Sequence, residues 1–335
     1  MDRAMLLEER NLRLSWDCHP SAYLDRYLVS GVEDPRINGQ SILTRALLVD
    51  ALYPGRFDAL LSEELRFGAV LMWILQQLEK GTTRCEILDR IESTCRTHVP
   101  EFIMRTHAWL QDKTCPIPDY IGTALGHFDC DMPAPCLSDL ALDTFMSIWN
   151  EQLSRMPART ISVLEIACGS ANDYRFLDRC GLTRHLSYTG IDIAARNIAN
   201  ARRHYPNADF RVGSILTMES AGSSYDYVFC HDLLEHLSLA AMERALGEMF
   251  RIARNTVILH FFNATRDPDH KIMPLRRYHR NQLSMQKLGV FFERLDAQVT
   301  CIEMTQWLRR KVGAPGYHNP NAFSLIVERQ VSLAK

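Results

Sequence analysis

From residue 160 onward, segments typical of β-strands alternate with segments typical of helices, and this alternation constrains the fold more than any other feature. Strands are predicted over 162–167, 186–192, 208–212, 225–230, 255–262, 298–308 ("QVTCIEMTQWL") and 322–329 ("AFSLIVER"). Helices are predicted near 172–180, 193–204, 238–254 and 284–295. Repeated strand–helix–strand units place helices on both faces of a parallel sheet. We therefore predict a Rossmann-like, doubly wound α/β fold with a mostly parallel seven-stranded sheet.

The part of the chain before residue 160 has a different sequence pattern. In residues 1–112 apolar residues recur at helical spacing, as at Ile42, Ala46 and Leu47, and no alternating strand pattern occurs. Four prolines then fall within 113–136, which indicates a connector because proline fixes φ and lacks an N–H donor. We predict an all-helical N-terminal domain (1–112) that caps the site, binds substrate or dimerises, a Pro-rich linker (113–137) and an α/β domain (138–335).

Composition excludes several classes of protein. The formal net charge of −2 gives no field that favours nucleic acid or an anionic membrane. The N-terminus has no uninterrupted apolar run of a signal peptide, and the ten cysteines are scattered, so we expect a cytoplasmic protein with reduced thiols. Cys115, His127, Cys130 and Cys136 match no compact zinc-finger spacing, and we predict no metal site.

The turn after the first strand is the first place to seek a ligand, because open α/β sheets bind ligands beyond the carboxyl ends of their strands. Here the sequence is "SVLEIACGSANDY" (162–174), with small residues at Ala167, Gly169 and Ala171. Only one glycine of the dinucleotide pattern G-x-G-x-x-G is present. Glu165 is an acid in a buried strand, which is costly without a cationic partner. A ligand ammonium group would compensate it, a pyrophosphate would repel it, and a structural arginine is the alternative partner.

Residues 138 to 330 resemble the class I S-adenosylmethionine-dependent methyltransferases. Their first motif is acid-x-Gly-x-Gly-x-Gly, and "EIACGSA" resembles it with alanine at both outer glycine positions. The resemblance implies S-adenosylmethionine as the cofactor. It places Glu165, Ala167, Cys168 and Gly169 against that cofactor.

Two further segments extend the resemblance. "YTGIDIA" puts Asp192 at the end of the second strand, where the family binds the ribose hydroxyls, with Ile193 beside it; a helix cap is the structural alternative for Asp192. "FRVGSIL" puts Ser214 and Ile215 after the third strand, beside the adenine, although the family often has an acid there.

"DYVFCHDLLEHL" resembles the family segment that faces the methyl group and its acceptor, and it places His231 and Asp232 there. Asp232 and Glu235 also have the spacing of a helix N-cap and its N3 partner. A hydroxyl acceptor needs a base, for which histidine is suited at neutral pH. The candidates for this base are His231, His236 and His279. For His236, a packed histidine without a catalytic role is an equally good interpretation.

The acceptor site is predicted in two loops after the later strands. The loop 270–284 carries four cations among other polar residues, and "GYHNPNAF" precedes the last strand. We expect substrate contacts from Arg277, Tyr278, His279, His318 and Asn321, with a merely solvated loop as the alternative.

We therefore predict methyl transfer from S-adenosylmethionine to an oxygen or nitrogen atom of a small molecule, such as a metabolite, a sugar or a natural-product intermediate, including anionic ones. A homodimer is compatible with this prediction. Two alternatives stay open: a catalytically idle cofactor-binding partner subunit, and an NAD-dependent oxidoreductase, which Glu165 disfavours.

Overall fold

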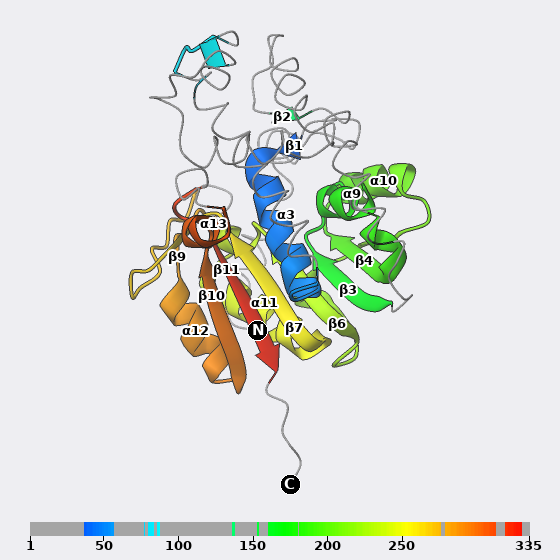
Figure 1. The fold of residues 1–335 in the computed structure, drawn as a ribbon. Coiled ribbons are helices and arrows are strands. Elements are labelled where there is room, and N and C mark those ends of the chain that lie inside the picture. Colours follow the sequence, from blue (N-terminus) through cyan, green and yellow to red (C-terminus); the bar gives the residue numbers. More distant parts are fainter. Residues whose placement is uncertain are drawn as a thin grey trace.

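The computed structural model describes residues 37–56, 77, 80–83, 86–87, 136–137, 153, 160–179, 181–275, 279–312 and 319–329. Its centre is a seven-stranded sheet with the spatial order β10-β11-β7-β6-β3-β4-β5 (Figure 1). The strands are β3 (Ile161–Ile166), β4 (Leu186–Asp192), β5 (Asp209–Val212), β6 (Tyr225–His231), β7 (Ala253–Phe261), β10 (Ala297–Glu303) and β11 (Phe323–Arg329). Only β11 runs antiparallel to its neighbours, so the predicted fold class is confirmed.

Strand order reverses between β3 and β6. From β3 the chain proceeds outward through β4 to β5, then returns to β6 on the other side of β3 and continues to β7. The chain segments that leave the carboxyl ends of β3 and β6 therefore run in opposite directions across the sheet. Such a topological switch point is where open α/β sheets bind ligands.

Helices cover both faces of the sheet (Figure 1). They are α3 (Gly39–Leu52), α9 (Asn172–Arg179), α10 (Ala195–His204), α11 (Leu239–Ile252), α12 (Met285–Glu293) and α13 (Met304–Val312). The predicted strand over 298–308 is wrong in its second half, because α13 begins at Met304. In that helix Met304, Trp307 and Leu308 are buried, at a spacing that fits a helix rather than a strand.

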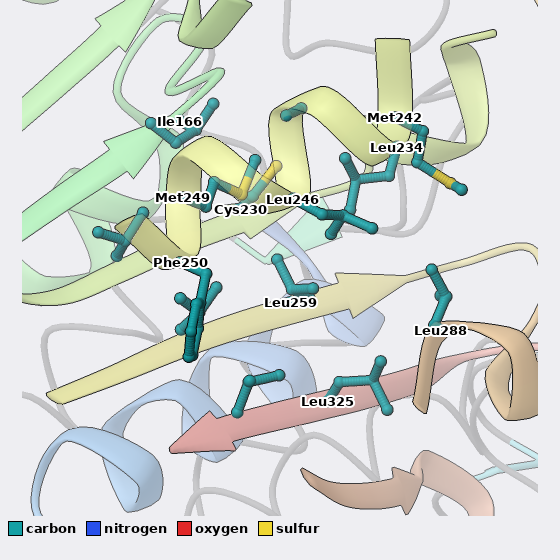
Figure 2. Packing of buried hydrophobic residues seen from close by; sticks show 14 of the residues in the cluster. Ile166, Cys230, Leu234, Met242, Leu246, Met249, Phe250, Leu259, Leu288 and Leu325 are labelled. Atoms are coloured by element: carbon teal, nitrogen blue, oxygen red, sulfur yellow. The ribbon is translucent and has the colours of Figure 1, made fainter. Parts of the chain in front are cut away.

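Strand alternation divides the side chains of the sheet between two faces. On one face Ile166, Cys230, Leu259 and Leu325 belong to the main core cluster, which also contains residues of α11 (Figure 2). Because successive strand residues point to opposite faces, Glu165, His231, His260 and Ser324 point to the other face. Thr44 of α3 contacts His260, which places α3 on this second face.

Most of the predicted N-terminal domain and linker lies outside the described residues, so the division of the chain stays a prediction. The structure does describe α3, and it adds a two-residue antiparallel pair, β1 (Ile37–Asn38) with β2 (Cys136–Leu137), that the helix-only prediction for 1–112 omits. No helix in the described ranges has the length and apolarity to cross a bilayer.

The segment 263–283 is more ordered than the polar loop that the sequence indicates. β8 (Ala264–Thr265) pairs with β9 (Leu283–Ser284), and Lys271 bridges to Gln282. Asn281 is fully buried, and its side-chain amide donates to the carbonyl of Leu237 at 2.7 Å. This segment is thereby fixed to the loop that follows β6.

Candidate functional site

The turn after β3 has the conformation of a glycine-rich turn even where alanine replaces glycine. Ala167, Gly169 and Ala171 all have positive φ angles, of 59°, 55° and 70°. Alanine rarely adopts this left-handed conformation, which glycine adopts freely. The two alanines therefore occupy the positions at which the motif has glycine, and they keep the local backbone free of large side chains. Cys168, between them, is buried.

Asp192 fastens this turn to the end of β4. Its Oδ2 accepts from the backbone N–H of Gly169 at 2.9 Å, and its Oδ1 accepts from the N–H of Ala194 at 2.7 Å. Burial raises the pKa of Asp192, and these backbone donors partly offset that rise. The N-cap of α10 is Ala194, so Asp192 is not the capping residue of that helix.

Glu165 has no direct ion pair with arginine among the described residues. It is 3% exposed, and its Oε2 accepts a hydrogen bond from the Tyr188 hydroxyl. Burial, reinforced by the nearby Asp173, raises the pKa of Glu165 well above its ordinary value. The charge of Arg45 lowers the pKa of Glu165 in part, but its guanidinium pairs with Asp173. An acid without an ion pair to a described residue therefore lies directly before the turn.

Gly190 makes room for the contact between Glu165 and Tyr188. It lies opposite Glu165 in the register of β3 and β4. A Cβ atom at Gly190 would lie 2.8 Å from the Tyr188 hydroxyl oxygen and 2.9 Å from Cδ1 of Phe210, which is too close. Sequence reasoning missed Tyr188 and Gly190, although strand alternation from Asp192 puts both on the face of the sheet that carries Glu165.

Asp173, in the first turn of α9, joins three elements. Its Oδ1 accepts from Nε of Arg45, and its Oδ2 lies 2.7 Å from Nδ1 of His231. Burial alone would raise the pKa of Asp173, but His231 and Arg45 outweigh it and hold that pKa well below its usual range. Sequence reasoning missed Asp173, because an acid in the first turn of a helix is common. It also missed Arg45, the second partner of Asp173, because Arg45 lies more than a hundred residues upstream.

His231 is therefore a histidine with a fixed tautomer. The ionised Asp173 only accepts hydrogen bonds, so Nδ1 carries the proton and Nε2 presents a lone pair when the ring is neutral. In the described part of the structure Nε2 has no partner. The ring of His260 lies beside that of His231, with the two centroids 5.5 Å apart. Nδ1 of His260 is 2.7 Å from Oγ of Ser324.

The segment after β6 connects loops instead of starting a helix. Asp232 has a positive φ of 50°, and α11 is capped by Ser238, so the predicted N-cap and N3 pairing of Asp232 with Glu235 is wrong. Glu235 is buried, and its Oε1 accepts from the N–H of Phe262 at 2.7 Å. Burial, then the nearby Asp232, raises the pKa of Glu235 to about 7.

His236 is engaged at both ring nitrogens. Its Nδ1 lies 3.1 Å from the carbonyl oxygen of His279 and so carries a proton, and its Nε2 lies 3.5 Å from Oδ1 of Asp232. Burial would lower the pKa of His236, but Asp232 outweighs it and raises the pKa overall. His279 itself is half-buried, and burial lowers its pKa.

The other predicted residues are placed as follows. Ser214 caps a short 3₁₀-helix (Ile215–Thr217) by accepting from the N–H of Leu216 at 3.2 Å, and Ile215 is buried. Ile193 is half-buried directly after Asp192. Asn321 is exposed, near the start of β11. Arg277, Tyr278 and His318 lie outside the described residues, as does the cysteine–histidine group, save the backbone of Cys136.

The charges of the site suit a cationic ligand. Three buried acids, Glu165, Asp173 and Asp192, lie at or beside the turn, and Arg45 is the one arginine paired with them in the part that the structure describes. A ligand with positive charge next to Glu165 would lower the pKa of this acid and offset its burial.

Comparison with known proteins identifies the central segment. Residues 163–256, from β3 into β7, match a family model described as "Methyltransferase domain". No curated protein sequence matches the chain.

Solved structures give weaker likenesses. One is an S-adenosylmethionine-dependent methyltransferase from Methanosarcina mazei, with 15% identity, 53% of this chain and 96% of that chain covered, and a TM-score of 0.39. Another is the 1,6-didemethyltoxoflavin-N1-methyltransferase of Burkholderia thailandensis, with 12% identity, 64% and 87% covered, and a TM-score of 0.39.

Proposed function

Residues 163–256 match the model of a methyltransferase domain, and from this match we propose that the chain is a class I methyltransferase that transfers a methyl group from S-adenosylmethionine to an oxygen or nitrogen atom of a small molecule. The observation that carries the proposal is Glu165, a buried acid that has no ion pair with a described residue and lies beside a turn of small residues. An oxidoreductase that binds a pyrophosphate at this turn is disfavoured for the same reason.

The residues present fit this cofactor. Glu165 would bind its ammonium group, and the backbone of Ala167, Cys168 and Gly169 would lie along it because no large side chain projects from the turn. Asp192 would accept from the ribose hydroxyls, with Ile193, Ser214 and Ile215 on the adenine side and Asp232 near the reacting end. When bound, S-adenosylmethionine supplies an electrophilic methyl group, so the protein's main task is to align the acceptor.

His231 is the base that we favour for a hydroxyl acceptor. Asp173 holds the proton on Nδ1, which leaves Nε2 to accept a proton from the acceptor. His236 is less suited because both of its nitrogens already have partners and its pKa is raised. His279 holds His236 through its backbone carbonyl, so its imidazole stays a third candidate.

The acceptor is proposed to be a metabolite, a sugar or a natural-product intermediate. The proposed contacts with this acceptor stay Arg277, Tyr278, His279, His318 and Asn321. The guanidinium of Arg277 is suited to an anionic group on the acceptor. A cytoplasmic location and a homodimer belong to the same proposal, without a role for nucleic acid or membrane.

Methyl transfer is tested by incubating the full chain with S-adenosylmethionine labelled in its methyl group and with fractionated extract of the native organism. We expect a labelled compound whose mass has increased by one methylene, as seen by mass spectrometry, and no such compound without the protein. Cofactor binding without transfer to any fraction would instead favour the idle partner subunit.

A further inference from the structure

Helix α3 brings a buried guanidinium group into the site. Arg45 is 9% exposed, its Nε donates to Oδ1 of Asp173, and its Cζ lies 6.0 Å from the ring centroid of Phe176. Phe176 and Asp173 both belong to α9, which starts directly after the turn. The contact of α3 with α9 thus places a fixed positive charge beside the turn.

Most of the hydrogen-bonding capacity of this guanidinium is unused. Arginine has five N–H donors, of which Nη1 and Nη2 carry four. Within the described residues, neither Nη1 nor Nη2 makes a hydrogen bond. Neither Nη group is among the buried side-chain atoms that lack a partner, so both are accessible although most of the side chain is buried, and their donors are available to a ligand acceptor. The pair of Nη groups matches the two oxygens of a carboxylate.

The position of Arg45 relative to Glu165 specifies which carboxylate. Arg45 donates to Asp173 through Nε, and the charges of Asp173 and Arg45 both act on the pKa of Glu165, so the three side chains are neighbours. The site therefore places Glu165 and the unused Nη donors of Arg45 around one carboxylate, that of Asp173. An α-amino acid group carries an ammonium and a carboxylate on one carbon atom, and S-adenosylmethionine ends in such a group.

We propose that Arg45 binds the carboxylate of the cofactor's amino-acid end through Nη1 and Nη2, so that the N-terminal helix α3 completes the cofactor site. This inference rests on the proposed function. The residue lies 118 positions before the start of the segment that matches the family model. The methyltransferase-domain segment then lacks one of its own cofactor contacts, and α3 must be seated on α9 for tight binding.

Two ligands that differ at the amino-acid end test the inference. S-Adenosylhomocysteine has the ammonium and carboxylate groups, and 5′-methylthioadenosine keeps the adenosine and the thioether but lacks both. We expect Arg45→Met in the full chain to weaken S-adenosylhomocysteine roughly 10- to 150-fold in calorimetric titration, the usual range for a hydrogen bond to a charged group. Binding of 5′-methylthioadenosine should change less than threefold. Arg45→Lys, which keeps the charge but loses the planar fork, should weaken S-adenosylhomocysteine by less.

Arg329→Met is the matched control. Arg329 also lies over an aromatic ring, with its Cζ 4.3 Å from the ring centroid of Phe250, but its Nε donates to the carbonyl of Ala253 at the amino end of β7, away from the site. This variant should bind both ligands as the unmodified protein does.

The outcomes distinguish failure of the proposed function from failure of the inference about Arg45. If the unmodified protein does not bind S-adenosylhomocysteine, the proposed function fails. If it does bind and Arg45→Met binds equally well, or if this variant loses both ligands equally, the inference about Arg45 is overturned. Should Arg45→Met fail to fold, the ratio of the two affinities in Arg45→Lys decides: an unchanged ratio contradicts the inference.

Discussion

Replacing Glu165 with glutamine removes a group that can ionise and keeps the shape of the side chain. The amide oxygen of glutamine can accept from the Tyr188 hydroxyl as Oε2 does now, and the amide N–H can donate to Asp173. Loss of the fold is therefore not expected. In the free protein we expect Glu165→Gln to unfold at the same or a higher temperature, because burial disfavours the charged carboxylate.

Cofactor binding should respond in the opposite direction. A hydrogen bond to a charged group is worth about 1.5–3 kcal/mol, which corresponds to roughly a 10- to 150-fold weaker affinity for S-adenosylmethionine. The raised pKa of Glu165 adds a second expectation. A cationic ligand favours the ionised form, so binding releases a proton, and the affinity of the unmodified protein rises as the pH increases toward that raised pKa. Glu165→Gln lacks both the proton release and this dependence on pH.

Isothermal titration calorimetry in two buffers of different ionisation enthalpy measures both quantities. Glu248→Gln, which removes a partly exposed acid that is paired with Arg251 on α11, is the control and should bind as the unmodified protein does. If Glu165→Gln binds S-adenosylmethionine with unchanged affinity and unchanged proton release, the role assigned to Glu165 is wrong.

Three further predictions concern the surroundings of Glu165. Asp192→Ala should weaken S-adenosylmethionine more than tenfold by calorimetry, whereas Asn197→Ala, which removes only a 3.4 Å contact to the same carboxylate, should change it less than threefold; equal effects would contradict the ribose assignment. Gly190→Ala should lower the free energy of unfolding in urea by about 1–3 kcal/mol, because its Cβ would displace the Tyr188 hydroxyl; unchanged stability would refute this packing. Glu235 has a pKa of about 7 in the folded protein, above its unfolded value, so its contribution to stability is complete at low pH and is lost as the pH rises through 7. Between pH 5 and pH 9 the unmodified protein should lose roughly 2–3 kcal/mol relative to Glu235→Gln in urea unfolding, and parallel curves for the two proteins would argue against that pKa.

The sheet and its order of elements were predictable because the chain repeats a simple local pattern. Each of the seven main strands carries buried apolar residues, and β3, β4, β6 and β10 each lead to an α-helix, so the boundaries of most elements agree with the structure within a few residues. The segment after Ile302 was not predictable in the same way. Its apolar residues Met304, Trp307 and Leu308 fit a strand or a helix over so short a span, and packing on the sheet decides.

The site was predictable only where its residues follow a strand. Glu165 and Asp192 lie near strand ends, where the order of the sheet alone brings them together. Arg45 gives no such signal, because it lies on a helix whose place on the sheet depends on tertiary contacts. Asp232 had the spacing of a helix cap, but its positive φ bends the chain and delays the helix until Ser238.

The central claim is that the buried acid before the turn of β3 serves a positively charged cofactor. Its most direct test is a calorimetric titration of the unmodified full chain with S-adenosylmethionine, S-adenosylhomocysteine and NAD under identical conditions. We predict saturable binding of the first two and no measurable binding of NAD. Binding of NAD together with no binding of S-adenosylmethionine would contradict the account.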